Sequence, residues 1–299
     1  MPTLIYTSPD PSRAPIIFSR DATDYKLLLA YSGFTETPVE HKTIVSPGQH
    51  GATVADSLMQ PRTISFSVMV QGATLAAVKT LITTLSNTLN PLNGTGTLQY
   101  VNDDGNTYLA YVRGSGNTVV PDTSTAGRGA TYQKVTVTLV AYDPFWYSGV
   151  SHLLSLSAAV VSFIPWYIPW YIGGQAATGT ANNSGSQETP VQITFNGPIT
   201  NPVLSRSYTI AGVTTTETIS LTITLLAGEK VVIQSGDGQQ SCFYYDTSGV
   251  EHLGEPYVDI ASMYWQLKPG ANSITFSCGS SGTQNDQAVV IWADRYTGV

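Results

Sequence analysis

Charged side chains are scarce in this sequence. Asp, Glu, Lys and Arg make up 11% of the 299 residues, whereas an average soluble protein has roughly 25%. Residues 1–150 carry nine Lys or Arg and ten Asp or Glu, and residues 151–299 carry four and ten. No basic stripe that could neutralise several phosphates is visible, so we expect no nucleic-acid binding. A hydrophobic content of 42% also argues against a disordered chain.

Long apolar runs and cysteines are also few. The longest apolar stretch, 153–172, is interrupted by Pro165 and Pro169, and it falls short of the about 20 mainly apolar residues of a membrane span. The first residues lack a basic segment followed by an apolar run, so we expect no signal peptide. The two cysteines, Cys242 and Cys278, do not make a disulfide framework. Buried free thiols are the commoner case, and the sequence leaves open whether the two pair.

Residue clusters that would support catalysis or metal binding are missing as well. The four histidines are scattered, without an HxH, HExxH or CxxC arrangement, and no G-x-S-x-G elbow occurs. Glycoside hydrolysis needs two carboxylates at one cleft. A β-sandwich could bring two of the carboxylates of the second half together by chance, which is weak support for such a site. We therefore assign no catalytic, cofactor-binding or metal-binding residue and expect the protein not to be an enzyme. The candidate carboxylates are Glu217, Glu251, Glu255 and Asp259.

Strand patterns and a single helix pattern fill the first 150 residues. Apolar residues alternate cleanly over Arg62–Gln71 and Tyr132–Ala141, which predicts half-buried strands. Between them, apolar residues at steps of three and four predict a helix over Ala73–Leu89, ended by Asn90-Pro91. Residues 114–130, rich in Gly, Ser and Thr, are predicted to form a mobile loop or arm. Further strands are predicted over Thr3–Thr7, Tyr25–Tyr31, Val39–Val45, Thr97–Val101 and Thr107–Val112, the last two joined by an Asp-Gly turn.

The second half shows strands at regular spacing and no helical period. Turn signals separate the strands, a pattern typical of a β-sandwich. Gly173–Gln187, rich in Gly, Asn, Ser and Thr, is predicted to be a linker-like loop. The predicted strands are Val191–Phe195, Val203–Ile210, Thr218–Leu225, Lys230–Gln234, Cys242–Asp246, Tyr257–Asp259, Ser273–Ser277 and Gln287–Ala293.

The sequence Ile-Pro-Trp-Tyr occurs twice in succession, over 164–167 and 168–171. It allows two interpretations: an aromatic platform for a sugar or a partner chain, or an extended, proline-stiffened strand packed between domains. The alternation of apolar residues puts Trp292 within a strand, which favours a position in the core. The same alternation puts the side chains of Tyr244 and Tyr245 on opposite faces of their strand. The candidate residues for a glycan or partner platform are Trp166, Trp170, Tyr245 and Trp265.

Several segments in a fixed order carry a resemblance to a known family. The first part closes with Ala-Tyr-Asp-Pro-Phe-Trp-Tyr over 141–147, preceded by the helix that runs into Asn90-Pro91 and by a Gly-rich hairpin. Thr189-Pro190 and Phe-Asn-Gly-Pro-Ile over 195–199 follow. Leu-Lys-Pro-Gly-Ala-Asn over 267–272 and a closing Arg-Tyr-Thr-Gly-Val come after them. Over nearly its whole length the chain resembles the siphophage distal tail proteins, which belong to the tail tip or baseplate.

The resemblance implies a mainly β fold with a boundary near residue 150. Residues 1–150 would form a ring-forming β-sandwich with one α-helix, 151–175 a connecting segment, and 176–299 a galectin-like β-sandwich of jelly-roll type. The protein would be a structural component of the virion. It would form a homo-hexameric ring that joins the tail tube to the host-adsorption apparatus. Its implied partners are the tail tube protein, the tail-associated hub protein, the tape measure and the receptor-binding proteins.

Two further expectations concern the redox state of the cysteines and an alternative function. Assembly in the host cytoplasm before incorporation at the tail tip would keep the cysteines reduced. The alternative function is a carbohydrate-binding adhesin module that recognises a host cell-surface glycan, because β-sandwiches often present Trp and Tyr to sugars.

Overall fold

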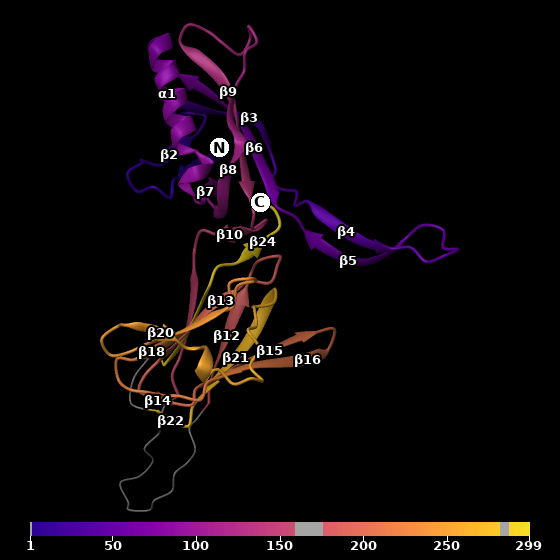
Figure 1. Cartoon of the computed structure of the whole chain (residues 1–299), viewed down its shortest axis with the longest axis vertical. Coiled ribbons are helices and arrows are strands. Elements are labelled where there is room, and N and C mark those ends of the chain that lie inside the picture. Colours follow the sequence, from indigo (N-terminus) through magenta and orange to yellow (C-terminus); the bar gives the residue numbers. More distant parts are fainter. Residues whose placement is uncertain (1, 159–175, 282–286) are drawn as a thin grey trace, which may run out of the picture. The chain divides into compact units, whose positions relative to one another are not determined.

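The chain, seen in a computed structural model that describes residues 2–158, 176–281 and 287–299, folds into two compact units (Figure 1). The first unit comprises Met1–Gly149 together with Tyr296–Val299, and the second comprises Val150–Arg295. Strands dominate both units, so the predicted mainly β fold with one α-helix is confirmed. The unit boundaries differ from the expected ones at two places. The last four residues belong to the first unit, and a strand begins at His152, inside the segment 151–175 that was expected to connect the units.

The first unit is built on one long sheet that folds over on itself. Its path is β2-β1-β7-β8-β9-β6-β3, and all the pairings named here are antiparallel. β8 belongs to both halves, since its first part pairs with β7 and its second part with β9, with an irregularity between Gly114 and Val119. The two halves enclose the core, where the rings of Phe18 and Phe66 meet edge to face at 5.1 Å. The strands are β1 (Thr3–Thr7), β2 (Ile16–Phe18), β3 (Tyr25–Ser32), β6 (Arg62–Gln71), β7 (Gly96–Val101), β8 (Thr107–Pro121), β9 (Tyr132–Ala141) and β10 (Trp146–Ser148).

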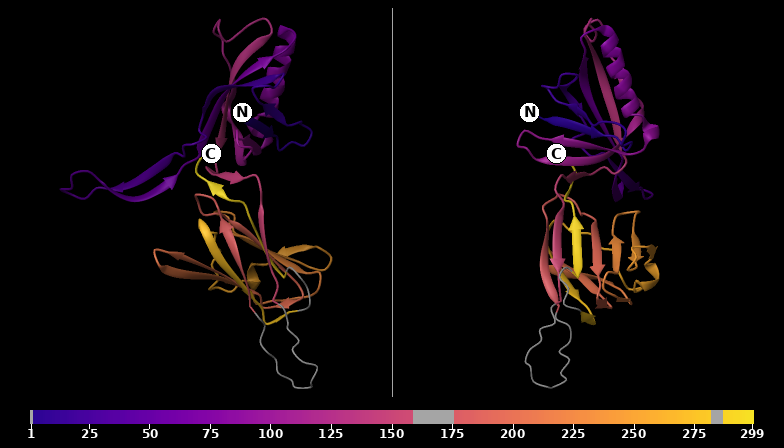
Figure 2. Two further views of the ribbon diagram at one scale, coloured as in Figure 1. Left: turned by 180° about the vertical axis from the view of Figure 1, so that it is seen from behind. Right: turned by 90° about the vertical axis from the view of Figure 1, so that its left-hand side faces the viewer.

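Helix α1 (Leu75–Thr88) covers one side of this sheet (Figure 2). The hydroxyl of Thr74 caps its start by accepting from the backbone N–H of Ala77 at 3.2 Å. The apolar stripe buries Val78, Leu85 and Leu89 against β6, β8 and β9. The helix ends before a short 3-10 turn, η1 (Pro91–Asn93). Among the described residues no helix is long and apolar enough to cross a membrane.

The second unit is a sandwich of two main sheets with a small third one. The larger sheet has the order β11-β23-β13-β18-β19-β20 and the smaller one β12-β21-β15-β16, while β17-β14-β22 forms the third. The rings of Phe195 and Phe276, from opposite sheets, lie 6.1 Å apart in the core. The strands are β11 (His152–Leu156), β12 (Ala177–Asn183), β13 (Val191–Asn196), β14 (Ile199–Thr200), β15 (Val203–Ile210), β16 (Val213–Ser220), β17 (Thr224–Leu225), β18 (Lys230–Gln234), β19 (Ser241–Tyr245), β20 (Glu251–Leu253), β21 (Gly270–Ser277), β22 (Ser280–Ser281), β23 (Ala288–Trp292) and β24 (Arg295–Tyr296), the last at the unit boundary.

Four local predictions were wrong. The predicted loop over 114–130 begins as strand, because the second part of β8 pairs with β9 although few of its residues are apolar. The predicted linker over Gly173–Gln187 contains β12, whose Ala, Thr and Gly residues pair with β21. The predicted single strand over Thr218–Leu225 is interrupted between Ser220 and Thr224. Where a strand was predicted over Tyr257–Asp259, the short 3-10 turn η2 (Glu255–Tyr257) ends instead.

Candidate functional site

A hairpin of β4 (Val39–Ile44) and β5 (Thr53–Met59) extends away from the rest of the first unit (Figures 1 and 2). We call this hairpin the arm. It forms a two-stranded sheet of its own, and every residue is exposed except Met59, which is half-buried. Ile44 and Val54 are 60% and 56% exposed. An isolated two-stranded hairpin is only marginally stable in water, and its free edges can pair with another chain. The arm is therefore a surface suited to contact with a partner.

The base of the arm is tied to the end of the chain through Arg62. Its buried guanidinium donates to the carbonyls of Gly33 and Phe34 at 3.2 and 3.0 Å, and also to Thr297 O. The hydroxyl of Thr37 accepts from the same group and donates to Thr297 O at 2.6 Å. Burial lowers the pKa of Arg62 to about 10, so the group stays charged at neutral pH. One hydrogen-bond network therefore holds both ends of the arm, through Thr37 before β4 and Arg62 after β5.

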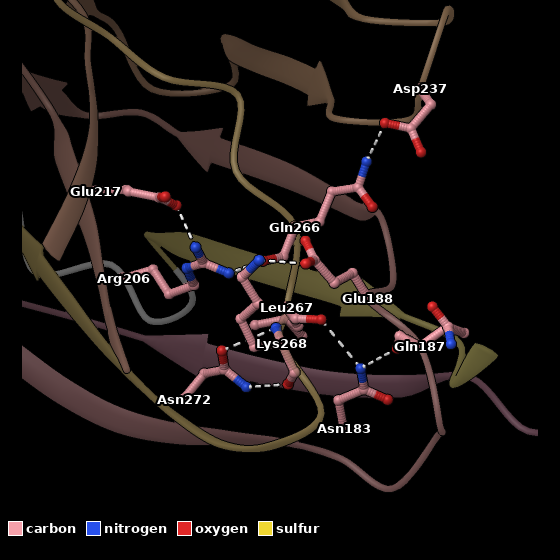
Figure 3. A network of polar contacts seen from close by, with 10 residues as sticks. All are labelled: Asn183, Gln187, Glu188, Arg206, Glu217, Asp237, Gln266, Leu267, Lys268 and Asn272. Carbon is pink, nitrogen blue, oxygen red and sulfur yellow. Dashed lines mark hydrogen bonds and ion pairs between the residues drawn. The ribbon is translucent and has the colours of Figure 1, made fainter. Parts of the chain in front are cut away.

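In the second unit, the buried Arg206 of β15 is the centre of a polar network (Figure 3). The guanidinium donates to the carboxylate of Glu217 on β16 and to the carbonyl of Gln266. It lies over the rings of Tyr208 and Trp265, with its central carbon 4.4 and 5.7 Å from the ring centroids. A buried charge is tolerated when it is paired and hydrogen-bonded. Arg206 thereby fixes the segment that carries Trp265 to the four-stranded sheet.

Two buried asparagines hold the neighbouring loop. The amide of Asn272 donates to the carbonyls of Lys268 and Gly270 at 2.8 and 3.0 Å. The amide of Asn183 donates to Leu267 O at 3.0 Å and to Gln187 O at 2.8 Å (Figure 3). The carbonyl of Leu267 also accepts from the backbone N–H of Thr189 at 3.0 Å. The amide of Asn272 bonds to carbonyls of its own loop, which explains the polar residue at the end of the Leu-Lys-Pro-Gly-Ala-Asn segment.

A cavity of about 180 Å³ adjoins this network. Two of its lining groups, Arg206 and Glu217, are bonded to each other, and Lys268 forms an ion pair with Glu188. Among the described residues no group of three or more His, Cys, Asp or Glu side chains could hold a metal ion. The arrangement stabilises loops and offers no nucleophile paired with a base. Its lining residues are Glu188, Arg206, Glu217, Met263, Tyr264, Trp265, Gln266 and Lys268.

The residues expected for an aromatic platform lie in different surroundings. Trp265 is 3% exposed and packs in the core of the second unit. Tyr245 is half-buried, its hydroxyl donates to Glu251 at 2.6 Å, and the ammonium of Lys230 lies 5.0 Å from its ring centroid. Trp166 and Trp170 lie outside the described residues. A ring as buried as Trp265 cannot stack on a sugar.

The structure also places the remaining aromatic candidates and the two cysteines. Trp292 is 6% exposed and belongs to the core, as predicted from its strand. Tyr244 packs against the same core, with its hydroxyl bonded to Glu229 at 2.7 Å. Cys242 and Cys278 are both buried, and no disulfide joins them. Burial raises the pKa of the Cys242 thiol to about 12.

Two family models match the chain, one in each unit. Residues 20–141 match the phage tail protein RIFT-related domain, and residues 184–296 match the C-terminal domain of the siphovirus-type tail component. Each of the two units thus belongs to a family of phage tail components. The chain is a structural component of a phage tail, located at the tail tip or baseplate of the virion. The resemblance carried by its sequence segments is thereby confirmed.

Solved structures agree with this tail component in fold. The Dit protein of phage SPP1, described as a paradigm of the hub adsorption apparatus in phages that infect Gram-positive hosts, has a TM-score of 0.65 at 13% identity, with 99% of each chain covered. A chain of the phage P2 baseplate, in its activated conformation with calcium, has a TM-score of 0.53 at 12% identity. The comparison covers 100% of this chain and 99% of that one. No curated protein matches the sequence.

Proposed function

We propose that this tail component forms a closed ring of six copies through its first unit, and that the ring joins the tail tube to the host-adsorption apparatus. The observation that carries the proposal is the arm, an exposed hairpin with apolar side chains on a unit that matches a phage tail protein domain. A closed ring uses a head-to-tail interface, in which one patch meets a different patch on the next copy. The arm is such a patch, because its edges and apolar side chains have no cover within the first unit.

The charge distribution supports the same arrangement. Residues 1–150 carry nine basic and ten acidic side chains, a net charge of −1, so copies brought together repel little. Residues 151–299 carry four basic and ten acidic side chains, a net charge of −6, which suits a surface that faces away from its copies. The second unit, as a galectin-like sandwich, would then contact the adsorption proteins. The tube protein, the hub protein and the tape measure would meet the ring itself.

A structural role without catalysis is part of the proposal. The described residues contain no metal-binding group, and the charged groups of the small cavity are engaged with one another. The adhesin alternative receives no support from Trp265 and Tyr245, since one ring is buried and the other has a cation over it.

The test is the number of copies of the full chain in solution. Native mass spectrometry should give six copies, or twelve as two stacked rings, and negative-stain images should show a ring. Substituting both Ile44→Asp and Val54→Asp on the arm should give monomers, because the charges prevent burial of the arm.

The matched control is Ile210→Asp with Val213→Asp. These side chains are exposed to a similar degree, 58% and 67%, at the tip of the β15–β16 hairpin of the second unit. The control should keep six copies. A monomeric wild type at tens of micromolar with no ring in the images would refute the proposal, and so would loss of the ring in the control alone.

A further inference from the structure

The outer face of the four-stranded sheet in the second unit carries no charged side chain. Alternate positions of its strands point outward: the even-numbered residues of β12 and β16, and the odd-numbered residues of β15 and β21. Twelve of these fifteen side chains are Ser or Thr, and the other three are Asn182, Val203 and Ala271. We call this surface the hydroxyl face. Its neutrality contrasts with the net charge of −6 over residues 151–299.

The hydroxyls on this face are ordered. Thr178 is bonded to Thr275 at 3.1 Å, and Ser205 to Thr218 at 2.9 Å. The strand register aligns these four residues in one row across all four strands. Two more cross-strand pairs follow along the β15–β16 hairpin, at 2.8 and 3.0 Å.

This pairing leaves a regular set of groups for a ligand. A hydroxyl has one donor and two acceptor lone pairs, so each bonded pair keeps one O–H and several lone pairs free. Strand geometry spaces them about 4.8 Å apart across the sheet and about 6.8 Å apart along it. The face is therefore a lattice of donors and acceptors without charge.

The chemistry of the face selects its occupant. An anionic polymer would need cations, and none lies there. A protein interface is usually centred on aromatic, aliphatic or Arg anchors, whereas the only apolar side chains here are Val203 and Ala271. A neutral polyhydroxyl polymer matches both the hydrogen-bonding groups and the missing charge. We propose that the hydroxyl face binds a neutral polysaccharide.

Binding at this face does not depend on the aromatic residues considered above. Without a ring to stack on the sugar, a single copy should bind weakly, in the millimolar range. Several copies on one particle would raise the apparent affinity through effective concentration, and this last gain alone rests on the proposed ring.

The test uses native gels of the full chain that contain one of two polymers with the same backbone, neutral hydroxyethylcellulose or anionic carboxymethylcellulose. We expect migration to be slowed by the neutral polymer and unaffected by the anionic one. A variant with Thr178→Val, Thr216→Val and Thr275→Val keeps the β-branched shape and removes three hydroxyls from the face. Its dissociation constant for hydroxyethylcellulose should rise at least threefold.

The matched control is Thr215→Val with Thr222→Val and Thr247→Val, three exposed threonines of the same unit outside the face. This control should bind like the wild type. No slowing by the neutral polymer, equal losses in the two triple variants, or slowing by the anionic polymer alone would overturn the proposal. Native mass spectrometry of the same samples separates the two ideas, since a monomer that is still slowed refutes the ring and supports the hydroxyl face.

Discussion

The carbonyl oxygen of Thr297 accepts a hydrogen bond from the guanidinium of Arg62, 235 positions earlier in the sequence. The backbone N–H of Val299 donates to Phe34 O at 3.1 Å, and the ring of Tyr296 meets that of Tyr108 at 5.3 Å. The end of the sequence thus completes the packing of the first unit around the base of the arm.

Arg62→Met should destabilise the first unit strongly. The substitution removes the charged donor that Gly33, Phe34 and Thr297 share, so the carbonyl of Phe34 keeps only the N–H of Val299 and that of Thr297 only the hydroxyl of Thr37. Hydrogen bonds to a charged group contribute more to stability than those between neutral groups. We expect a loss on the order of 3 kcal/mol in the free energy of unfolding, measured by urea denaturation of the full chain. Arg113→Met, at an exposed arginine, should cost less than about 0.5 kcal/mol. Equal effects of the two would contradict the anchoring role of Arg62.

Gly33→Ala should be much more harmful than Gly105→Ala. Both glycines have φ near +80°, at +81° and +83°, so both substitutions carry the backbone strain of about 1–2 kcal/mol. Only at Gly33 would the new Cβ lie 2.0 Å from a backbone oxygen, that of Thr63, whereas nothing lies within 4 Å at Gly105. We expect Gly33→Ala to lower the melting temperature much further, as measured by calorimetry. A smaller shift than that of Gly105→Ala would disprove this account of the turn.

Glu217→Leu should cost about 3–5 kcal/mol, because it leaves the guanidinium of Arg206 buried without its carboxylate. Adding Arg206→Met should restore part of that stability, since both charges are then gone. The control pair is Asp10 with Arg13, which is about one-third exposed, so Asp10→Leu should change stability by less than about 1 kcal/mol. Chemical denaturation of the wild type, Glu217→Leu, the double variant and Asp10→Leu measures these differences in the free energy of unfolding. A double variant that is less stable than Glu217→Leu would contradict the prediction.

The stability of the chain should fall as the pH rises from 9 toward 12. Burial raises the pKa of Cys242 from 9.0 to about 12, and the hydrogen bond to Glu229 does most to raise that of Tyr244 to about 12. The folded state therefore keeps protons that the unfolded state loses in this interval, which favours unfolding. Cys242→Ala should flatten the pH dependence of the free energy of unfolding. The prediction fails if denaturation curves of variant and wild type have the same pH dependence between 9 and 11.

The sequence predicted those elements whose apolar residues alternate strictly. The bounds of β6 and β9 agree with the predicted Arg62–Gln71 and Tyr132–Ala141 because each strand has one buried face. β5 and β12 were not predicted, because neither shows that alternation of apolar and polar residues. β5 is exposed on both faces, and β12 consists of small and polar residues. In such strands the backbone pairing with a neighbour supplies the order, and pairing cannot be read from the strand itself.

The side chains of the candidate sites were harder to predict. The sequence gives no sign that Arg62 and Arg206 are buried, since their acceptors Thr297 and Gln266 lie 235 and 60 positions away. Trp265 was taken as a candidate for an exposed platform, and tertiary packing decided its burial. The family, the mainly β fold and the place at the tail tip followed from ordered segments. The hexamer and the galectin-like character of the second unit stay predictions.

The membership of Tyr296–Val299 in the first unit has a consequence for biosynthesis. At roughly 5–20 residues per second, the ribosome needs roughly 7–30 s to make the intervening residues after the first unit has emerged. During that interval Arg62 lacks the acceptor on Thr297, so the first unit cannot reach its final packing. A nascent or prematurely terminated chain would present an incomplete base beneath its arm. The first unit therefore reaches its final packing only after Tyr296–Val299 have been made.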